Sequence, residues 1–219
     1  MPAADSSPYE PATTKAYRML ERMIVTLALP PGGVATEGVL IERIGLGRTP
    51  VREAIQRLAW EGLVEIRPRA GLAIAPLQPG DWLRVLDARR GVEVILARSA
   101  ARLIAHESAK RFEQAALAMQ RAVIAGDVAA FLEADKALDE VMAATADNDF
   151  AARLAAPLQT HSRRFWFRYR RHSGLAEAAE HHVGIIQAIL DSNEDGAGRE
   201  AERLIALLRL HAVEAETTG

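Results

Sequence analysis

The amino-acid sequence predicts a mainly α protein, in which three short helices and a β-hairpin precede an all-α bundle of longer helices. Three observations support this prediction. Strand-like runs occur only between residues 63 and 75, and long amphipathic segments fill the chain after residue 81. Of the 219 residues, 49% are hydrophobic and 26% are charged, a composition typical of globular proteins.

The first elements follow from capping residues and helix breakers. We expect residues 1–12 to form a flexible arm, because they are polar and contain proline. A first helix is expected over residues 13–27, and the Pro-Pro-Gly-Gly run at 30–33 ends it. A second helix follows over residues 36–44, with Thr36 at its start.

A third helix and a hairpin complete this part of the chain. Thr49 is expected to cap the helix, with Pro50 at its first position and Gly62 after its end. Two strand-like runs, 63–66 and 72–75, flank a turn that contains proline and glycine. Three helices followed by a hairpin is the order of a winged helix-turn-helix.

The predicted organisation is therefore a winged helix-turn-helix over residues 13–76, a linker at 77–80 and an all-helical domain over 81–215. The helices expected in the second domain are 81–106, 109–125, 127–145, 149–172, 176–191 and 199–215.

Charge and composition exclude several classes of protein. The net charge is −2, but the segment from Arg43 to Arg69 carries +3, while residues 77–219 carry −3. Without cysteine there is no disulfide or thiolate zinc site. The N-terminal residues lack the features of a signal peptide, and no apolar run approaches the ~18 residues that span a membrane. We therefore expect a cytoplasmic protein without a membrane partner.

The start of the third helix carries candidate DNA-contacting residues. Arg48 and Arg52 lie one helical turn apart, and arginine can contact guanine edges or phosphates. Thr49 can reach a phosphate or a thymine methyl group. The alternative is that these arginines are only solvated helix charges. The order of turn, helix and hairpin favours DNA.

The hairpin turn supplies a second set of candidates. Arg67, Arg69 and Gly71 suit contact with the DNA backbone or the minor groove.

The run Arg-Thr-Pro-Val-Arg-Glu-Ala-x-x-Arg-Leu-x-x-Glu-Gly-Leu-Val at 48–64 resembles the signature of the GntR family of transcriptional regulators. Residues 81–213 are more loosely similar to the FCD ligand-binding domain of its FadR-like subfamily. The resemblance implies that Arg48, Thr49 and Arg52 contact operator DNA, and that the wing near Gly71 contacts the minor groove. Two residues depart from the family pattern. Gly47 replaces a Ser or Thr cap, and Gly38 replaces a basic residue.

Several polar residues fall on apolar helix faces of the second domain, where burial needs a compensating partner. A shared cavity that holds an anion, a metal or both would explain them together. Each also has a simpler explanation: the histidines can be hydrogen-bonded core residues, Arg89 can pair with Asp135, and Asp139 can face water. The residues concerned are Arg89, Asp135, Asp139, His161, His182 and His211.

The resemblance also implies a metal site. Many FCD domains bind a divalent metal through an Asp, a His one turn later and two further His residues. Asp135 and His182 match two of these positions, and Asp139 stands where the second ligand is usually His. His211 completes the set only if residues 192–198 are an insertion. Zinc, nickel and manganese are not distinguished, and a protein without metal remains the alternative.

The same resemblance implies an organic-acid effector, because Arg89 matches a position that faces such ligands in similar proteins. The expected effector site consists of Arg89, Asp135, His161 and His182. A small carboxylate, with or without a bound metal, is the ligand that suits an arginine fork.

Residues 163–172 mix arginines with aromatic residues. We expect a helix whose aromatic side chains pack inward and whose arginines face water or the first domain. The alternative is nucleic-acid stacking.

The predicted function is a ligand-responsive repressor of a metabolic operon, a homodimer on a palindromic operator and not an enzyme. Two alternatives stay open. One is a metal-dependent hydrolase or lyase that uses Asp135, Asp139 and His182, and the other is a DNA-binding dimer whose bundle is purely structural.

Overall fold

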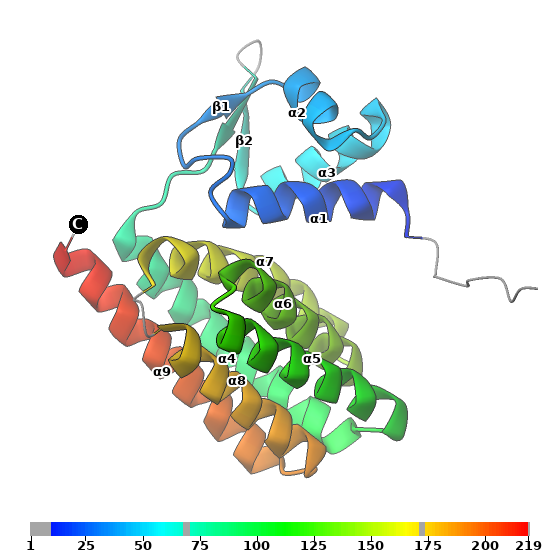
Figure 1. Ribbon diagram of the computed structural model, residues 1–219, viewed down its shortest axis with the longest axis vertical. Helices are drawn as coiled ribbons and strands as arrows, with labels where there is room; N and C mark the ends of the chain where they lie inside the picture. Colours follow the sequence, from blue (N-terminus) through cyan, green and yellow to red (C-terminus); the bar gives the residue numbers. More distant parts are fainter. Residues whose placement is uncertain (1–9, 68–70, 171–173, 219) are drawn as a thin grey trace, which may run out of the picture. The chain divides into compact units, whose positions relative to one another are not determined.

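The computed structural model describes residues 10–67, 71–170 and 174–218, and the chain divides into two compact units, Met1–Leu77 and Gln78–Gly219 (Figure 1). The fold class expected from the sequence, three helices with a small sheet followed by a helical bundle, is confirmed. Of the expected N-terminal arm, only its last residues lie within the described part, and the first helix already begins at Ala12.

The N-terminal unit, Met1–Leu77, packs helices against a small antiparallel sheet. Tyr17, Leu20 and Ile24 recur at helical spacing on α1 and bury one face against the core, which also takes in Val51 and Leu58 of α3. The elements are α1 (Ala12–Val25), β1 (Val34–Ala35), α2 (Glu37–Ile44), α3 (Arg48–Trp60), β2 (Val64–Arg67) and β3 (Gly71–Ile74).

The sheet has the strand order β1-β3-β2 and contains one strand more than the sequence predicted. The additional strand, β1, has two residues, and Val34 and Ala35 pair with Ala73 and Leu72 of β3. A strand of two residues is too short to show the alternation by which strands are recognised in a sequence.

Local chemistry sets the ends of α2 and α3. The Thr36 side chain accepts a hydrogen bond from the Val39 amide at 3.3 Å, and Gly45 ends α2 in the left-handed conformation with φ 70°. The prediction that Thr49 caps α3 is wrong. The cap is Gly47, and the helix begins at Arg48, because Gly47 already has the extended backbone of a cap residue.

The C-terminal unit, Gln78–Gly219, is an all-α bundle around α4. This helix packs against α9, α7, α8 and α6 (Figure 1). Its core includes Trp82, whose ring stacks on Phe165 of α7 with centroids 5.9 Å apart. The helices are α4 (Pro79–Leu103), α5 (His106–Ala125), α6 (Val128–Thr145), α7 (Asp149–Tyr169), α8 (Gly174–Leu190) and α9 (Glu194–Thr218).

Four helices of the bundle, α4, α5, α8 and α9, begin two to five residues earlier than the sequence suggested. α4 begins at Pro79 rather than at residue 81, within the expected linker. α9 begins at Glu194 rather than at residue 199, because the Asn193 side chain accepts a hydrogen bond from the Gly196 amide at 2.9 Å. The expected long loop at 192–198 is therefore mostly helix.

None of the described helices combines the length and the apolar character that crossing a membrane requires.

Candidate nucleic-acid interface and candidate ligand cavity

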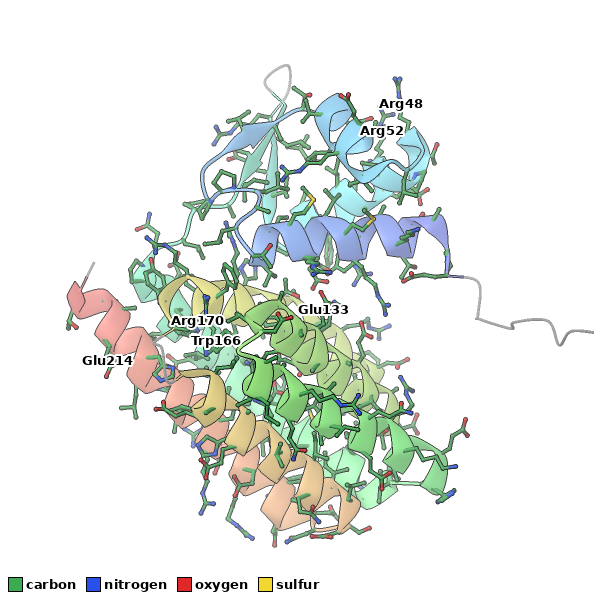
Figure 2. All side chains as sticks on the ribbon, in the orientation of Figure 1. Arg48, Arg52, Glu133, Trp166, Arg170 and Glu214 are labelled. Atoms are coloured by element: carbon green, nitrogen blue, oxygen red, sulfur yellow. The ribbon has the colours of Figure 1, made fainter. Side chains whose placement is uncertain are left out.

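The exposed face of α3 carries the arginines that the sequence singled out. Val51 and Leu58 turn one side of the helix into the core, so Arg48, Thr49 and Arg52 are left exposed on the other side. Figure 2 shows Arg48 and Arg52 projecting outward from the N-terminal unit. Their spacing of one turn places Arg48 and Arg52 on the same side of the helix, which suits a helix that reads a groove.

Arg52 is held by a residue that the sequence analysis missed. The Arg52 guanidinium donates two hydrogen bonds to Glu37 of α2, Nε to Oε2 at 3.2 Å and Nη2 to Oε1 at 3.0 Å. This fork-to-fork arrangement fixes the plane of the guanidinium as well as its position. Glu37 lies 15 residues away along the chain, and no local pattern pairs the two residues.

The first turn of α3 also offers backbone groups to an anion. Gly47 has no side chain to accept a hydrogen bond, so the first amides of the helix have no side-chain cap. The positive end of the helix dipole lies at the same place, next to Arg48. This end of α3 therefore suits a phosphate group.

The wing consists of β2 and β3. Arg67 at the end of β2 is exposed and pairs with Glu65, with Nη2 and Oε2 2.8 Å apart. Gly71 has φ +91°, and a Cβ at this position would lie 2.6 Å from the Ala35 carbonyl oxygen. Glycine at residue 71 is therefore required by the close approach of β1. Arg69, the remaining candidate of the wing, lies outside the described residues.

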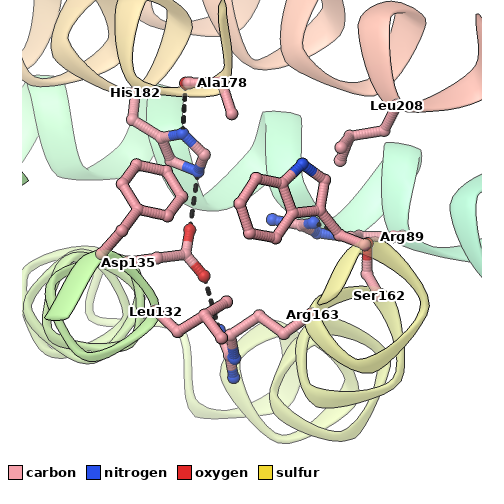
Figure 3. Close-up of a pocket in the computed structure, with 10 residues that line it drawn as sticks. Arg89, Leu132, Asp135, Ser162, Arg163, Ala178, His182 and Leu208 are labelled. Carbon is pink, nitrogen blue, oxygen red and sulfur yellow. Dashed lines mark hydrogen bonds and ion pairs between the residues drawn. The ribbon is translucent and has the colours of Figure 1, made fainter. Parts of the chain in front are cut away.

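In the C-terminal unit, ten residues from five helices line a cavity of about 20 Å³ (Figure 3). Three of them, Arg89, Asp135 and His182, belong to the expected effector site. The ten lining residues are Arg89 of α4, Phe131, Leu132 and Asp135 of α6, Ser162, Arg163 and Trp166 of α7, Ala178 and His182 of α8, and Leu208 of α9.

Arg89 is already engaged within the protein. Its Nε donates to Glu93 Oε2 at 2.8 Å, and its Nη1 donates to Ser162 Oγ at 3.2 Å. Both members of the ion pair are almost completely buried. The suggestion that Arg89 pairs with Asp135 is wrong, and the partner is Glu93, which lies one turn along the same helix. That spacing was visible in the sequence.

Asp135 and His182 form a buried pair. His182 Nε2 lies 2.6 Å from Asp135 Oδ1, and His182 Nδ1 donates to the Ala178 carbonyl at 2.6 Å (Figure 3). Burial lowers the pKa of His182, but the Asp135 carboxylate outweighs burial and raises it above the ordinary value. Burial likewise opposes ionisation of Asp135, whereas the charges of His182 and Arg163 hold its pKa below the ordinary range.

Asp139 lies one turn after Asp135 and is buried rather than facing water. Arg163 of α7 bridges the two carboxylates, because its Nη1 lies 2.5 Å from Asp139 Oδ2 and 3.1 Å from Asp135 Oδ2. Burial, together with the negative charge of Asp135, raises the pKa of Asp139 to about 7.

The two other candidate histidines, His161 and His211, do not join this group. His161 is half-buried and is not among the cavity-lining residues. His211 is buried on α9, and its Nε2 lies 3.5 Å from Glu177 Oε2. The long loop expected at 192–198, on which a ligand role for His211 depended, is not present, because α9 already begins at Glu194.

Phe165 and Trp166 of α7 pack inward as expected, but two arginines contradict the expectation that the arginines of 163–172 face water or the first domain. Arg163 and Arg164 are buried, as are Phe165 and Trp166. Trp166 lines the cavity, and its indole Nε1 has no hydrogen-bond partner among the described residues. Residues 171–172 of this stretch lie outside the described part of the chain.

Comparison with known proteins assigns both units to known domain families. The model of the FCD domain matches residues 84–207, and the model of the bacterial regulatory proteins of the gntR family matches residues 12–74. The chain belongs to the gntR family, in the branch with an FCD domain.

Individual relatives agree with this assignment. A repressor from Escherichia coli K12 named RspR is 29% identical over 150 residues, which cover 66% of this chain and 64% of the relative. A Paenarthrobacter nicotinovorans protein named "Probable D-xylose utilization operon transcriptional repressor" is 27% identical over 180 residues, 81% of this chain and 79% of the relative. The match thus spans less than two thirds of the E. coli relative's length.

Solved structures support the fold. The E. coli protein McbR/YncC superposes with a TM-score of 0.79 at 15% identity, over 94% of this chain and 99% of that one. A GntR-type protein from Rhodococcus sp. RHA1 gives a TM-score of 0.73 at 18% identity, over 93% and 98% of the two chains. Since the family consists of regulatory proteins, membership speaks against the enzyme alternative.

The bundle of this gntR-family member does not offer the metal site that the sequence suggested. Among the described residues, no group of three or more His, Asp or Glu side chains is arranged to hold a metal ion. The Arg163 guanidinium lies between Asp135 and Asp139, and His211 faces Glu177 instead. A cation among the would-be ligands does not fit a bound divalent metal.

Proposed function

We propose that this gntR-family protein is a transcriptional regulator, whose N-terminal unit binds operator DNA and whose C-terminal unit binds a small ligand. The observation that carries the proposal is the exposed pair of Arg48 and Arg52 at the first turn of α3. Two guanidinium groups beside an uncapped helix start supply both base and phosphate contacts. The repressor names of two relatives support repression as the direction of regulation.

An affinity comparison tests the DNA interface. Arg52→Ala is expected to weaken operator binding by ~1–3 kcal/mol and to relax selectivity at the contacted base pair. Arg18→Ala is the matched control, since Arg18 is also exposed but lies on α1 and pairs with Glu10. Both variants are measured at the same salt concentration. If the Arg52 variant binds the operator as tightly as the control does, the assignment of α3 to the DNA interface is wrong.

We further propose that the protein is a homodimer on a palindromic operator. Closed two-fold symmetry is the commonest arrangement of soluble oligomers, and such a dimer reads two half-sites one helical turn or a multiple apart. Light scattering on the purified protein measures the stoichiometry, and footprinting on its own promoter region measures the half-site spacing. A monomer that protects a single asymmetric site would contradict this part of the proposal.

The ligand is proposed to be a small molecule with an oxygen acceptor, a carboxylate being the first class to test. Trp166 lines the cavity and its Nε1 has no acceptor among the described residues, and a buried unpaired donor is unfavourable by ~1–3 kcal/mol. A carboxylate oxygen can accept from this group and compete with Glu93 for Arg89. A cavity of about 20 Å³ is close to the size of one water molecule, so the ligand requires a wider state.

A thermal-shift screen with small carboxylates tests the ligand proposal. A ligand present at 100 times its Kd stabilises the folded state by ~2.7 kcal/mol, which raises the midpoint of unfolding measurably. Trp166→Phe is expected to abolish the shift. The small size of the cavity favours the second candidate function, a regulator with a purely structural bundle. No shift across the panel, with operator binding intact, would support that candidate.

A further inference from the structure

The carboxylates of Asp135 and Asp139 share one positively charged partner. The two residues lie four apart on α6, so both project from the same face of that helix. Arg163 approaches from α7 and donates through Nη1 to Asp139 at 2.5 Å and to Asp135 at 3.1 Å. All three side chains are more than nine-tenths buried, so little solvent screens the charges.

The guanidinium is held in this position from a second direction. Arg163 Nη2 donates to Thr160 Oγ1 at 3.2 Å, one turn earlier on α7. An arginine side chain has no acceptor atom and stays protonated at every pH a protein tolerates. The bridging group is therefore a permanent cation that is part of the chain.

The remaining charges around the pair are also matched. Glu93 is neutralised by Arg89, and the second oxygen of Asp135 faces His182 Nε2 at 2.6 Å. A divalent metal binds deprotonated side chains that offer a lone pair, and a guanidinium group offers none. Among these described side chains, each of the three carboxylates is paired with an arginine or a histidine, so none of them is left for a metal ion.

We infer that Arg163 takes the place of a divalent metal at the Asp135–Asp139 pair, so that the C-terminal unit folds without metal. The Arg163 guanidinium neutralises two carboxylates that would otherwise repel each other in the interior. The inference stands apart from the proposed function, because metal content and unfolding are measured without DNA.

Metal analysis of the tag-free wild-type protein is the direct test. We expect a background content of zinc, nickel or manganese after purification, on the order of 0.1 equivalent per chain or less, since no site retains these metals. Dialysis against EDTA, or addition of each metal chloride alone, should leave the midpoint of thermal unfolding unchanged. Stoichiometric metal in the protein, or a midpoint that EDTA lowers and metal restores, would overturn the inference.

Variants test the role of Arg163 itself. Arg163→Gln leaves two buried carboxylates without their cation, so we expect its unfolding midpoint to fall by roughly 5 °C or more. The double variant Arg163→Gln/Asp139→Asn should regain most of that loss, because only one carboxylate remains. Arg153→Gln is the control, since Arg153 is exposed on the same helix. If Arg163→Gln is as stable as the control, the inference is wrong. If Arg163→Gln does not fold, failure of the double variant to restore folding would also overturn it.

Discussion

The orientation of Arg52 depends on Glu37, and this dependence gives a prediction at the scale of single residues. Glu37→Gln removes the negative charge that holds the guanidinium in a fixed plane. We expect nonspecific DNA binding to rise, because a carboxylate near the phosphates is lost. The preference for the operator over random duplex should fall by up to about tenfold, a value within the range for one bidentate base contact.

The measurement compares Kd values for operator and random duplex at one salt concentration. Glu42→Gln provides the control, because Glu42 is exposed on the same helix, α2, and its replacement removes the same charge. An operator preference that drops equally in both variants would mean that charge alone, and not the position of Arg52, determines it.

Protonation of the buried cluster gives the second residue-scale prediction. The pKa of Asp139 in the folded protein is raised to about 7, so its contribution to stability is complete below pH ~4 and is lost as the pH rises through 7. The raised pKa of His182 adds a loss above pH ~6.5, whereas the lowered pKa of Asp135 acts only below pH ~4. Arg163, Glu93 and Arg89 are the other charged groups that act on Asp139.

We therefore expect the temperature at which the C-terminal unit unfolds to decrease as the pH rises from 5 to 8. Fluorescence of the buried Trp82 and Trp166 reports on this unit. Asp139→Asn should flatten the decrease between about pH 5 and pH 7, because the asparagine stays neutral at every pH. Asp191→Asn, at an exposed position, should retain the wild-type profile. A midpoint that rises over this range would contradict the raised pKa of Asp139.

At the scale of elements, the wing depends on one glycine. Gly71→Ala places a Cβ 2.6 Å from the Ala35 carbonyl oxygen and requires φ +91° of an alanine. We expect the N-terminal unit to lose about 1–3 kcal/mol of stability and the sheet to shift at β1. Gly32→Ala separates the two effects, since Gly32 has φ +73° but no atom within 4 Å of the added Cβ.

Urea unfolding followed by circular dichroism measures both variants. The loss for Gly71→Ala should exceed the loss for Gly32→Ala, because only the first adds a steric clash with backbone. Equal losses would indicate that β1 moves away freely and that Gly71 is needed for its backbone conformation alone.

Most elements could be predicted because their signals are local. The buried face of α3 follows from apolar spacing, and the break before α2 follows from the Pro-Pro-Gly-Gly run. The start of α9 was misplaced because Gly196 and Gly198 were interpreted as loop residues, although the Asn193 side chain begins a helix there. Glycine signals flexibility on average, and one side-chain hydrogen bond outweighs that tendency.

The candidate sites were predicted less completely, for a physical reason. Arg89, Asp135 and His182 could be found because a polar residue on an apolar face needs a partner. The identity of the partner depends on which helices lie next to each other. The arginines of 163–172 were expected to face water or the first domain, yet Arg163 lies inside the bundle, where it pairs with the carboxylates of α6. Whether these residues bind an effector stays a prediction.

At the scale of the whole molecule, the proposed regulation requires a thermodynamic link between ligand and DNA. If a carboxylate changes operator affinity, operator binding must change the affinity for that carboxylate by the same factor. We expect a factor of ~5–150, which corresponds to a coupling of ~1–3 kcal/mol. A cavity of about 20 Å³ is too small for a carboxylate ligand, so such a ligand would bind a state of the protein with a wider cavity. Regulation then requires that this wider state and the present state differ in their affinity for DNA.

The test uses the carboxylate that gives the largest thermal shift. Its Kd is measured for the free protein and for the operator complex, and operator Kd is measured with and without saturating carboxylate. The two ratios should agree, and Trp166→Phe should bring both to one by removing the unpaired donor of a residue that lines the cavity. If the carboxylate binds the wild type but both ratios equal one, ligand binding in the cavity has no effect on DNA binding. The bundle would then stabilise the regulator without controlling it.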